Sequence, residues 1–95
     1  MDVKIYNGNN SANVYLTPYC DMYIDENGLL IINRFYNTSI RIKGNNLALQ
    51  NIWTGLKYGI SKEAFDSLLK MLEGDSTELK KRLMEGCFIE EYSAI

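Results

Sequence analysis

Apolar and polar residues alternate with a period of two through much of the first half of the chain, which is typical of β-strands. In residues 19–25 and 38–43 the apolar side chains fall on one face and the polar ones on the other. Residues 29–32 are apolar on both faces, as in a central strand that is covered on both sides. The pattern predicts three antiparallel strands, over residues 19–25, 29–35 and 38–43, that follow one another as a meander.

The dipeptide Asn27-Gly28 separates the first two predicted strands. It is the strongest short signal for a hairpin, because a type I′ turn needs a positive φ at both of its central residues. We therefore expect these two residues to form the centre of a tight turn.

The second half of the chain changes to the period of a helix. Leu49, Ile52, Trp53 and Leu56 recur at the spacing of one helix face. An asparagine at position 45 or 46 is a suitable N-cap for this helix, and Gly59 is a suitable end.

Two more helices are predicted downstream. Ser61 is a good N-cap for the second, whose apolar stripe runs through residues 65–72 and which should continue to the glycine at position 74. Asp75 is a cap for the third, and Glu78 three positions later completes a capping-box arrangement. Gly86 should end this helix, and a short extended segment should follow it.

A run of strands followed by a run of helices predicts the α+β class. The expected architecture is a three-stranded antiparallel β-meander followed by a three-helix, winged helix-turn-helix-like bundle. A chain of 95 residues is long enough for one core. We expect residues 18–95 to form a single domain and the asparagine-rich residues 1–17 to be a flexible or short-strand segment.

Composition excludes several kinds of chemistry. The chain has no histidine, which removes histidine general bases and most zinc sites. Cys20 and Cys87 are too few for a disulfide framework or a four-thiolate metal site, and both are expected to be reduced. No nucleophile, base and orienting group can be assembled from these residues. A binding module without metal or cofactor is therefore expected, and not an enzyme.

Charge and hydropathy limit the partners and the location. The net charge of −2 provides no overall basic field for nucleic acid. No apolar run approaches the roughly 20 residues that a membrane-spanning helix needs. The first residues lack the basic and then apolar layout of a signal peptide. We expect a cytoplasmic protein that does not bind membranes.

The third predicted strand should lie at an edge of the sheet, because strand order in a meander follows the sequence. An edge strand exposes unpaired N–H and C=O groups. Two interpretations remain open at this point. Arg41 and Lys43 could protect the edge from aggregation, or the edge could accept an extended peptide as an extra strand, with the two cations attracting acidic side chains.

The third helix carries consecutive cations at positions 80–82, flanked by Glu78 and Glu85. Such a run is typical of a solvated helix face, and contact with DNA phosphates is the alternative. Met84 lies one residue off the apolar stripe. It could belong to the core, or it could line a groove between this helix and the edge strand, where a flexible thioether suits variable partners.

The whole pattern resembles a known family of peptide-binding domains. The residues that carry the resemblance are Ile52-Trp53, Gly59-Ile60-Ser61, Glu78-Leu79 and Gly86-Cys87-Phe88-Ile89, together with the meander that precedes them. In this layout the chain is similar, over residues 18–90, to the RiPP recognition element. That element is the PqqD-like winged helix-turn-helix domain of ribosomal peptide natural-product biosynthesis.

The resemblance implies peptide binding without catalysis. Members of this family take the leader of a precursor peptide as an extra strand on the third strand of the sheet, against the third helix. Carried over to this chain, the peptide-binding residues would be Thr38, Ser39, Ile40, Arg41, Ile42 and Lys43 on the strand, and Lys80 and Met84 on the helix.

The partners that the resemblance implies are a leader peptide and a separate maturation enzyme of the radical SAM, cyclodehydratase or dehydratase type. A homodimer is also plausible, because an exposed edge strand can pair with a copy of itself. Two other interpretations of the residues stay open. One is a winged-helix DNA-binding regulator, and the other is a small module of the immunity or anti-repressor kind that binds a protein partner.

Overall fold

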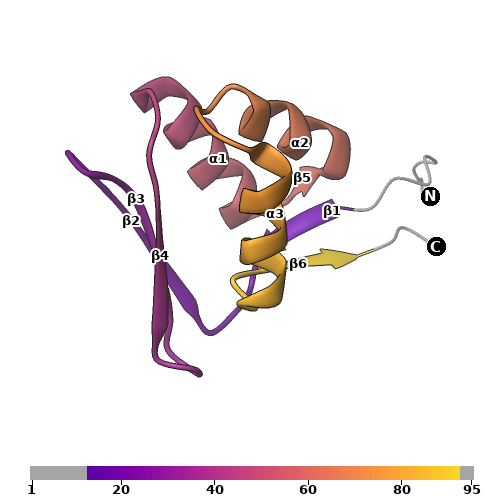
Figure 1. The fold of residues 1–95 in the computed structure, drawn as a ribbon. Coiled ribbons are helices and arrows are strands. Elements are labelled where there is room, and N and C mark those ends of the chain that lie inside the picture. Colours follow the sequence, from indigo (N-terminus) through magenta and orange to yellow (C-terminus); the bar gives the residue numbers. More distant parts are fainter. Residues whose placement is uncertain (1–12, 93–95) are drawn as a thin grey trace.

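The computed structural model describes residues 13–92 of the chain, and in this range it contains three helices and two three-stranded antiparallel sheets (Figure 1). The α+β class is therefore confirmed. In chain order the elements are β1 (Asn13–Leu16), β2 (Cys20–Asp25), β3 (Gly28–Asn33), β4 (Thr38–Ile42), α1 (Asn46–Tyr58), β5 (Ile60–Ser61), α2 (Lys62–Lys70), α3 (Ser76–Glu85) and β6 (Ile89–Tyr92).

The predicted meander is present as the sheet β2-β3-β4. Its register places Ile31 of β3 between Met22 of β2 and Ile40 of β4. Figure 1 shows this sheet nearly edge-on, with all three helices on one side of it. One face of the sheet therefore packs on the helices.

The apolar run in β3 is covered on one face only. Leu29 and Ile31 are fully buried on the face that meets the helices, whereas Leu30 and Ile32 are only partly buried on the other face. The prediction that both faces of this strand are covered is wrong. Antiparallel sheets commonly leave one face in contact with water.

The hairpin between β2 and β3 is confirmed, but its turn differs from the prediction. Asp25 pairs with Gly28, so Glu26 and Asn27 form the centre of the turn. Gly28 has a φ of 119°, whereas Asn27 does not have a positive φ. The carboxylate of Asp25 accepts a hydrogen bond from the N–H of Asn27 at 2.8 Å and forms an Asx-turn, which replaces the expected type I′ geometry.

The three helices begin at the predicted caps. The side chain of Asn45 accepts a hydrogen bond from the N–H of Ala48, and that of Ser61 accepts one from the N–H of Ala64. Asp75 caps α3 in the same way, through the N–H groups of the second and third helical residues. Each of these bonds satisfies N–H groups that the first helical turn leaves without a partner.

The predicted ends are confirmed for two helices. Gly59, with a φ of 99°, follows α1, and Gly86 follows α3. The second helix is shorter than predicted and stops at Lys70, because the N–H of Met71 bonds the carbonyl oxygens of Leu68 and Leu69. Gly74 lies in the connection that follows.

A second sheet, in the order β5-β1-β6, joins the two ends of the described chain to the start of α2. The prediction of one run of strands followed by one run of helices is wrong, since β5 lies between α1 and α2, whereas the extended segment expected after the third helix is present as β6. The central strand, β1, lies within the segment that was predicted to be flexible or a short strand. The remainder of that segment, residues 1–12, lies outside the described residues.

One hydrophobic core holds both sheets and all three helices together. Val14 of β1, Ile31 of β3, Ile52 of α1, Phe65 of α2 and Leu83 of α3 are all fully buried in the same cluster. Within residues 13–92, no helix combines the length and the apolar composition that crossing a membrane requires.

Candidate functional site

In the part of the chain that the structure describes, the edge of the meander is open along β4. Among residues 13–92, β4 pairs with β3 alone, and β1 pairs with β5 and β6 instead. Edge strands of this kind carry a row of unpaired main-chain groups. The strand predicted to lie at the edge is thus at an edge in the structure.

The direction of these main-chain groups follows from the register. In an antiparallel pair, the N–H and C=O groups of alternate residues point to the partner strand, and those of the residues between them point away. The carbonyl oxygen of Ile42 lies against Gly28 at the start of β3. The main-chain groups of Ser39 and Arg41 therefore point toward the free edge.

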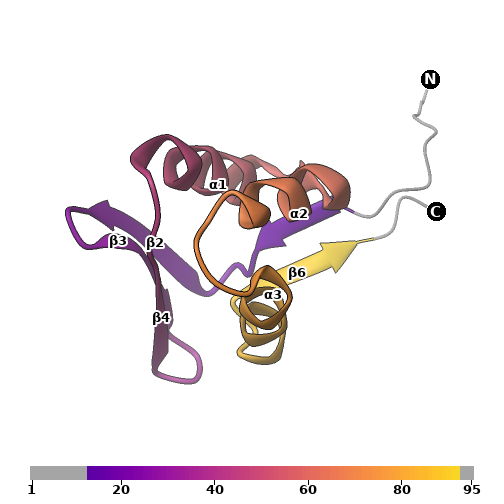
Figure 2. The same cartoon turned by 45° about the horizontal axis from the view of Figure 1, so that its top comes forward.

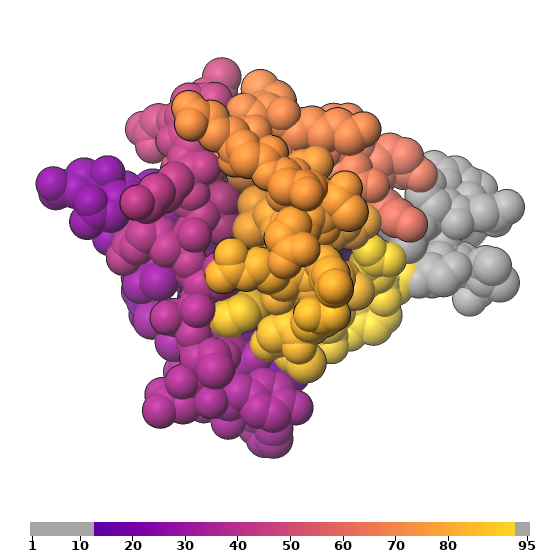
Figure 3. All heavy atoms as spheres, in the orientation of Figure 1, coloured from indigo at the N-terminus to yellow at the C-terminus, as the bar shows by residue number. Residues whose placement is uncertain are grey.

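A groove of about 340 Å³ lies between β4 and α3. The two elements lie side by side in both ribbon views and on one face of the molecular surface (Figures 1, 2 and 3). The groove is lined by Arg41, Ile42 and Lys43 at β4, by Glu73 and Asp75 between α2 and α3, and by Glu78, Leu79 and Arg82 of α3.

The groove has an apolar floor and a charged rim of mixed sign. Ile42 is buried and Leu79 is half-buried, and both belong to or pack on the core. Three cationic side chains and three anionic side chains share the rim. The groove therefore does not have the purely basic character that Arg41 and Lys43 suggest when they are considered without the helix.

The side chains of β4 alternate as predicted. Ile40 and Ile42 are buried against the core, whereas Thr38, Ser39 and Arg41 are exposed. The guanidinium of Arg41 binds the carboxylate of Asp25 with an N–O distance of 2.9 Å. The Asn27 N–H, and to a smaller degree Arg41, hold the pKa of Asp25 below its usual value.

Lys43 and Arg82 differ from Arg41, which is paired with Asp25. Within the described part of the chain, neither forms an ion pair. Both lie at the groove and both are exposed. They are therefore the cations most readily available to an incoming ligand at this site.

The structure does not bring Lys80 and Met84 to the groove beside β4. Both line a different hollow, between α2 and α3, together with Asp66 and Leu69. On a helix, residues 80 and 84 lie on one side of the buried stripe at Leu79 and Leu83, and residues 78 and 82 lie on the other side. The α3 wall of the groove is thus formed by Glu78, Leu79 and Arg82.

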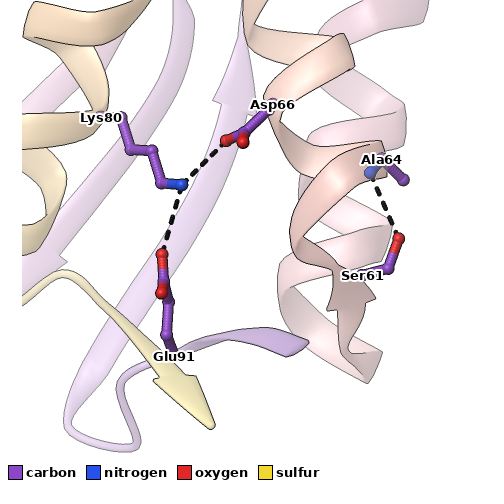
Figure 4. Close-up of polar contacts among 5 residues, drawn as sticks. All are labelled: Ser61, Ala64, Asp66, Lys80 and Glu91. Carbon is purple, nitrogen blue, oxygen red and sulfur yellow. Dashed lines mark hydrogen bonds and ion pairs between the residues drawn. The ribbon is translucent and has the colours of Figure 1, made fainter. Parts of the chain in front are cut away.

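Lys80 has a structural partner set instead. Its ammonium lies 2.9 Å from the carboxylate of Asp66 on α2 and 3.3 Å from that of Glu91 on β6 (Figure 4). Partial burial alone would lower the pKa of Lys80, but the hydrogen bonds to both carboxylates outweigh burial and raise it. Lys80 therefore joins three elements and is already neutralised.

Asn33 connects the meander to the end of α3, and sequence analysis did not identify it. This fully buried side chain donates from Nδ2 to the carbonyl oxygens of Gly86 and Cys87, at 2.9 and 3.3 Å. Its Oδ1 accepts from the N–H groups of Phe35 and Tyr36, both at 3.0 Å. Asn33 thus fixes the β3–β4 turn against the C-terminal end of α3.

The sequence signal that could have identified Asn33 was its place in the alternating pattern of β3. It continues the inward-facing phase of Leu29 and Ile31 on β3, where a polar residue needs buried hydrogen-bond partners. The carbonyl groups that accept from its Nδ2, those of Gly86 and Cys87, are more than fifty residues away in sequence. The pattern of the strand could therefore indicate a buried polar contact, but not its partners.

Cys20 and Cys87 are both free, and we expect them to react differently. Burial raises the pKa of the Cys20 thiol to about 11, so it stays protonated and poorly nucleophilic at pH 8. Cys87 is only partly buried. With a thiol-exchange reagent at pH 8, the native protein should show one fast-reacting thiol and the urea-unfolded protein two. Cys87→Ser should abolish the fast phase, whereas its loss in Cys20→Ser would contradict this assignment.

The raised pKa of Cys20 also predicts that stability changes at alkaline pH. Because the folded state raises the pKa of Cys20 above its unfolded value near 9, the folded state is favoured while the thiol is protonated. The contribution of the Cys20 thiol to the free energy of unfolding should therefore decline as the pH rises from about 9 to about 11.

No protein-family model, no curated protein and no solved structure matches this chain.

Proposed function

We propose that this protein is a cytoplasmic, non-catalytic module that binds an extended segment of a precursor peptide as an added strand on β4. The observation that carries the proposal is the edge of β4, which no strand of residues 13–92 occupies and which lies beside a groove with an apolar floor. Strand addition to such an edge is a common mode of peptide recognition.

The two parts of the site would contribute in different ways. The outward main-chain groups of Ser39 and Arg41 would hydrogen-bond to the guest backbone and provide affinity that depends little on sequence. Because side chains alternate along a strand, every second guest residue would face the groove. Ile42 and Leu79 favour apolar residues at those positions.

The charged rim would add a preference for partners with side chains of both signs. Lys43 and Arg82 would attract acidic side chains, whereas Glu73 and Glu78 would attract basic ones. Because the two signs balance, we expect salt to weaken binding only modestly. In the biosynthetic role that the family resemblance suggests, the guest is the leader of a ribosomal peptide, and the module presents it to a separate maturation enzyme of the radical SAM, cyclodehydratase or dehydratase type.

The test begins with the selection of binders from a displayed library of random peptides of roughly ten residues, the length of a long strand. Binding of a selected, fluorescein-labelled peptide is then measured by anisotropy on Ser39→Pro and on its matched control, Ser39→Ala. Proline removes an outward N–H that the sheet itself does not use, so the fold should be retained. We expect Ser39→Pro to weaken binding at least about tenfold and Ser39→Ala to change it less than about twofold.

The peptide offers a second test that does not depend on how the variant folds. N-methylation of single guest residues removes one N–H at a time, and an added strand should show a loss at every second position. Equal effects at all positions, or unchanged binding to a folded Ser39→Pro protein, would refute strand addition to β4.

A further inference from the structure

Two aromatic side chains stand exposed at the turn between β3 and β4. Phe35 is 70% exposed and Tyr36 is 55% exposed. Their rings form a T-shaped pair with centroids 4.9 Å apart, and the ring centroids of Tyr19 and Phe35 are 5.4 Å apart. Phe35 and Tyr36 together form an aromatic turn.

The backbone of the aromatic turn is fixed, although its rings are exposed. The buried amide of Asn33 accepts hydrogen bonds from the N–H groups of both residues. Asn37 closes the turn with a φ of 58°, a conformation that asparagine tolerates well. A partner that binds these rings would therefore lose little entropy in ordering them, and exposed aromatic residues on such a backbone are typical of binding hot spots.

The position of the aromatic turn indicates its partner. It leads directly into Thr38, the first residue of the free edge strand. A guest chain that is paired along Ser39 and Arg41 and continues past Thr38 must therefore run toward this turn. Phe35 and Tyr36 present aromatic rings to an incoming residue, and the adjacent Arg34 already pairs with Asp21 at 3.0 Å, so the surface offered to the guest at this turn is mainly apolar.

We propose that the guest of β4 carries an aromatic or large aliphatic residue just beyond its paired segment, and that this residue packs on Phe35 and Tyr36. The inference rests on the proposed function and adds a specificity determinant to it. The aromatic turn would fix the register of the guest, because the main-chain bonds along β4 can form in more than one register. The anchor residue would thus decide which guest residues face the groove.

The test is a double-mutant cycle with a peptide selected on the wild-type protein. One arm replaces the terminal aromatic or aliphatic residue of the peptide by serine, and the other arm uses Phe35→Ser/Tyr36→Ser. We expect serine in the peptide to weaken binding to the wild type about tenfold, as the loss of one aromatic contact would. Binding to the double variant should change less than about twofold on the same replacement.

Tyr58→Ser is the matched control, since Tyr58 is 71% exposed and ends α1 next to β5, which belongs to the other sheet. It should preserve the tenfold effect. Because Phe35 also contacts Tyr19, thermal unfolding is measured for each variant, and Tyr36→Ser alone replaces the double variant if that variant does not fold.

The outcomes separate the two proposals. If Ser39→Pro abolishes binding but the cycle shows no coupling, the anchor is refuted and strand addition stands. If the aromatic turn instead mediates self-association, light scattering will show a dimer that Phe35→Ser/Tyr36→Ser dissociates, and the anchor is refuted as well. If no peptide is selected at all, both proposals fail.

Discussion

Asn33→Asp should lower the free energy of unfolding by about 3 kcal/mol at pH 7, the range expected when a buried polar network is broken. The introduced carboxylate could still accept from the N–H groups of Phe35 and Tyr36. Its second oxygen would face the carbonyl oxygens of Gly86 and Cys87, which can only accept. The loss of the two donated hydrogen bonds and the burial of a negative charge therefore both lower the free energy of unfolding.

The destabilisation should depend on pH in a defined direction. Burial beside two carbonyl oxygens would raise the pKa of the introduced carboxyl above its unfolded value near 4. The folded state would then be favoured while this group is protonated, so the variant should be least destabilised below about pH 4 and most destabilised near neutrality. Urea unfolding at several pH values measures this dependence.

Asn51→Asp is the control for the change from amide to carboxylate, because Asn51 is exposed on α1. It should alter stability by no more than about 0.5 kcal/mol. A loss at Asn33 that equals the loss at Asn51, or that is the same at pH 4 and pH 7, would show that the Asn33 network does not hold the turn to α3.

Val14→Asp should abolish cooperative folding or lower the free energy of unfolding by at least about 4 kcal/mol, because it places a charge in the core without a partner. Val14 is fully buried and lies on the central strand of the second sheet, paired with Ile60 and Glu91. The isosteric Val14→Thr should cost about 1 to 2 kcal/mol, since it buries a hydroxyl without a large change of volume.

Thermal unfolding followed by circular dichroism is the measurement for this series. Tyr15→Thr changes the neighbouring residue on the same strand, and its partly buried side chain should make it much milder than Val14→Asp. If Val14→Asp unfolds at the temperature of the wild type, β1 is not part of the cooperative domain.

The helices could be predicted from sequence because their signals are local. Asn45, Ser61 and Asp75 each lie within three residues of the N–H groups that they cap. The meander was predictable for a related reason, since consecutive strands of alternating pattern pair with their neighbours. The edge position of β4 followed from that order alone.

The pairing of the second sheet could not be predicted in the same way. Its strands are two to four residues long, and β1 pairs with segments from the middle and the end of the described chain. Such short stretches carry too few alternations to indicate a strand. Their stability comes from tertiary contacts, which a local pattern does not contain.

The candidate site was predictable on its strand side and not on its helix side. The apolar stripe at Leu79 and Leu83 indicates which face of α3 is buried. It does not indicate which flank of that stripe turns toward β4, because the rotation of the helix depends on its packing against α2 and β6. The ion pairs of Lys80 with Asp66 and Glu91 are part of that packing.

The placement of the Asn33 contact determines which end of α3 could move if the groove takes guests of different size, as proposed. The contact holds α3 to the sheet at the C-terminal end of the helix, near Gly86. The groove extends toward the N-terminal end, near Asp75 and Glu73, where α3 follows a connection that contains Gly74. If β4 binds a guest as proposed, bulky guest residues should be accommodated by outward tilting of the first turn of α3, while the spacing at the opposite end stays constant.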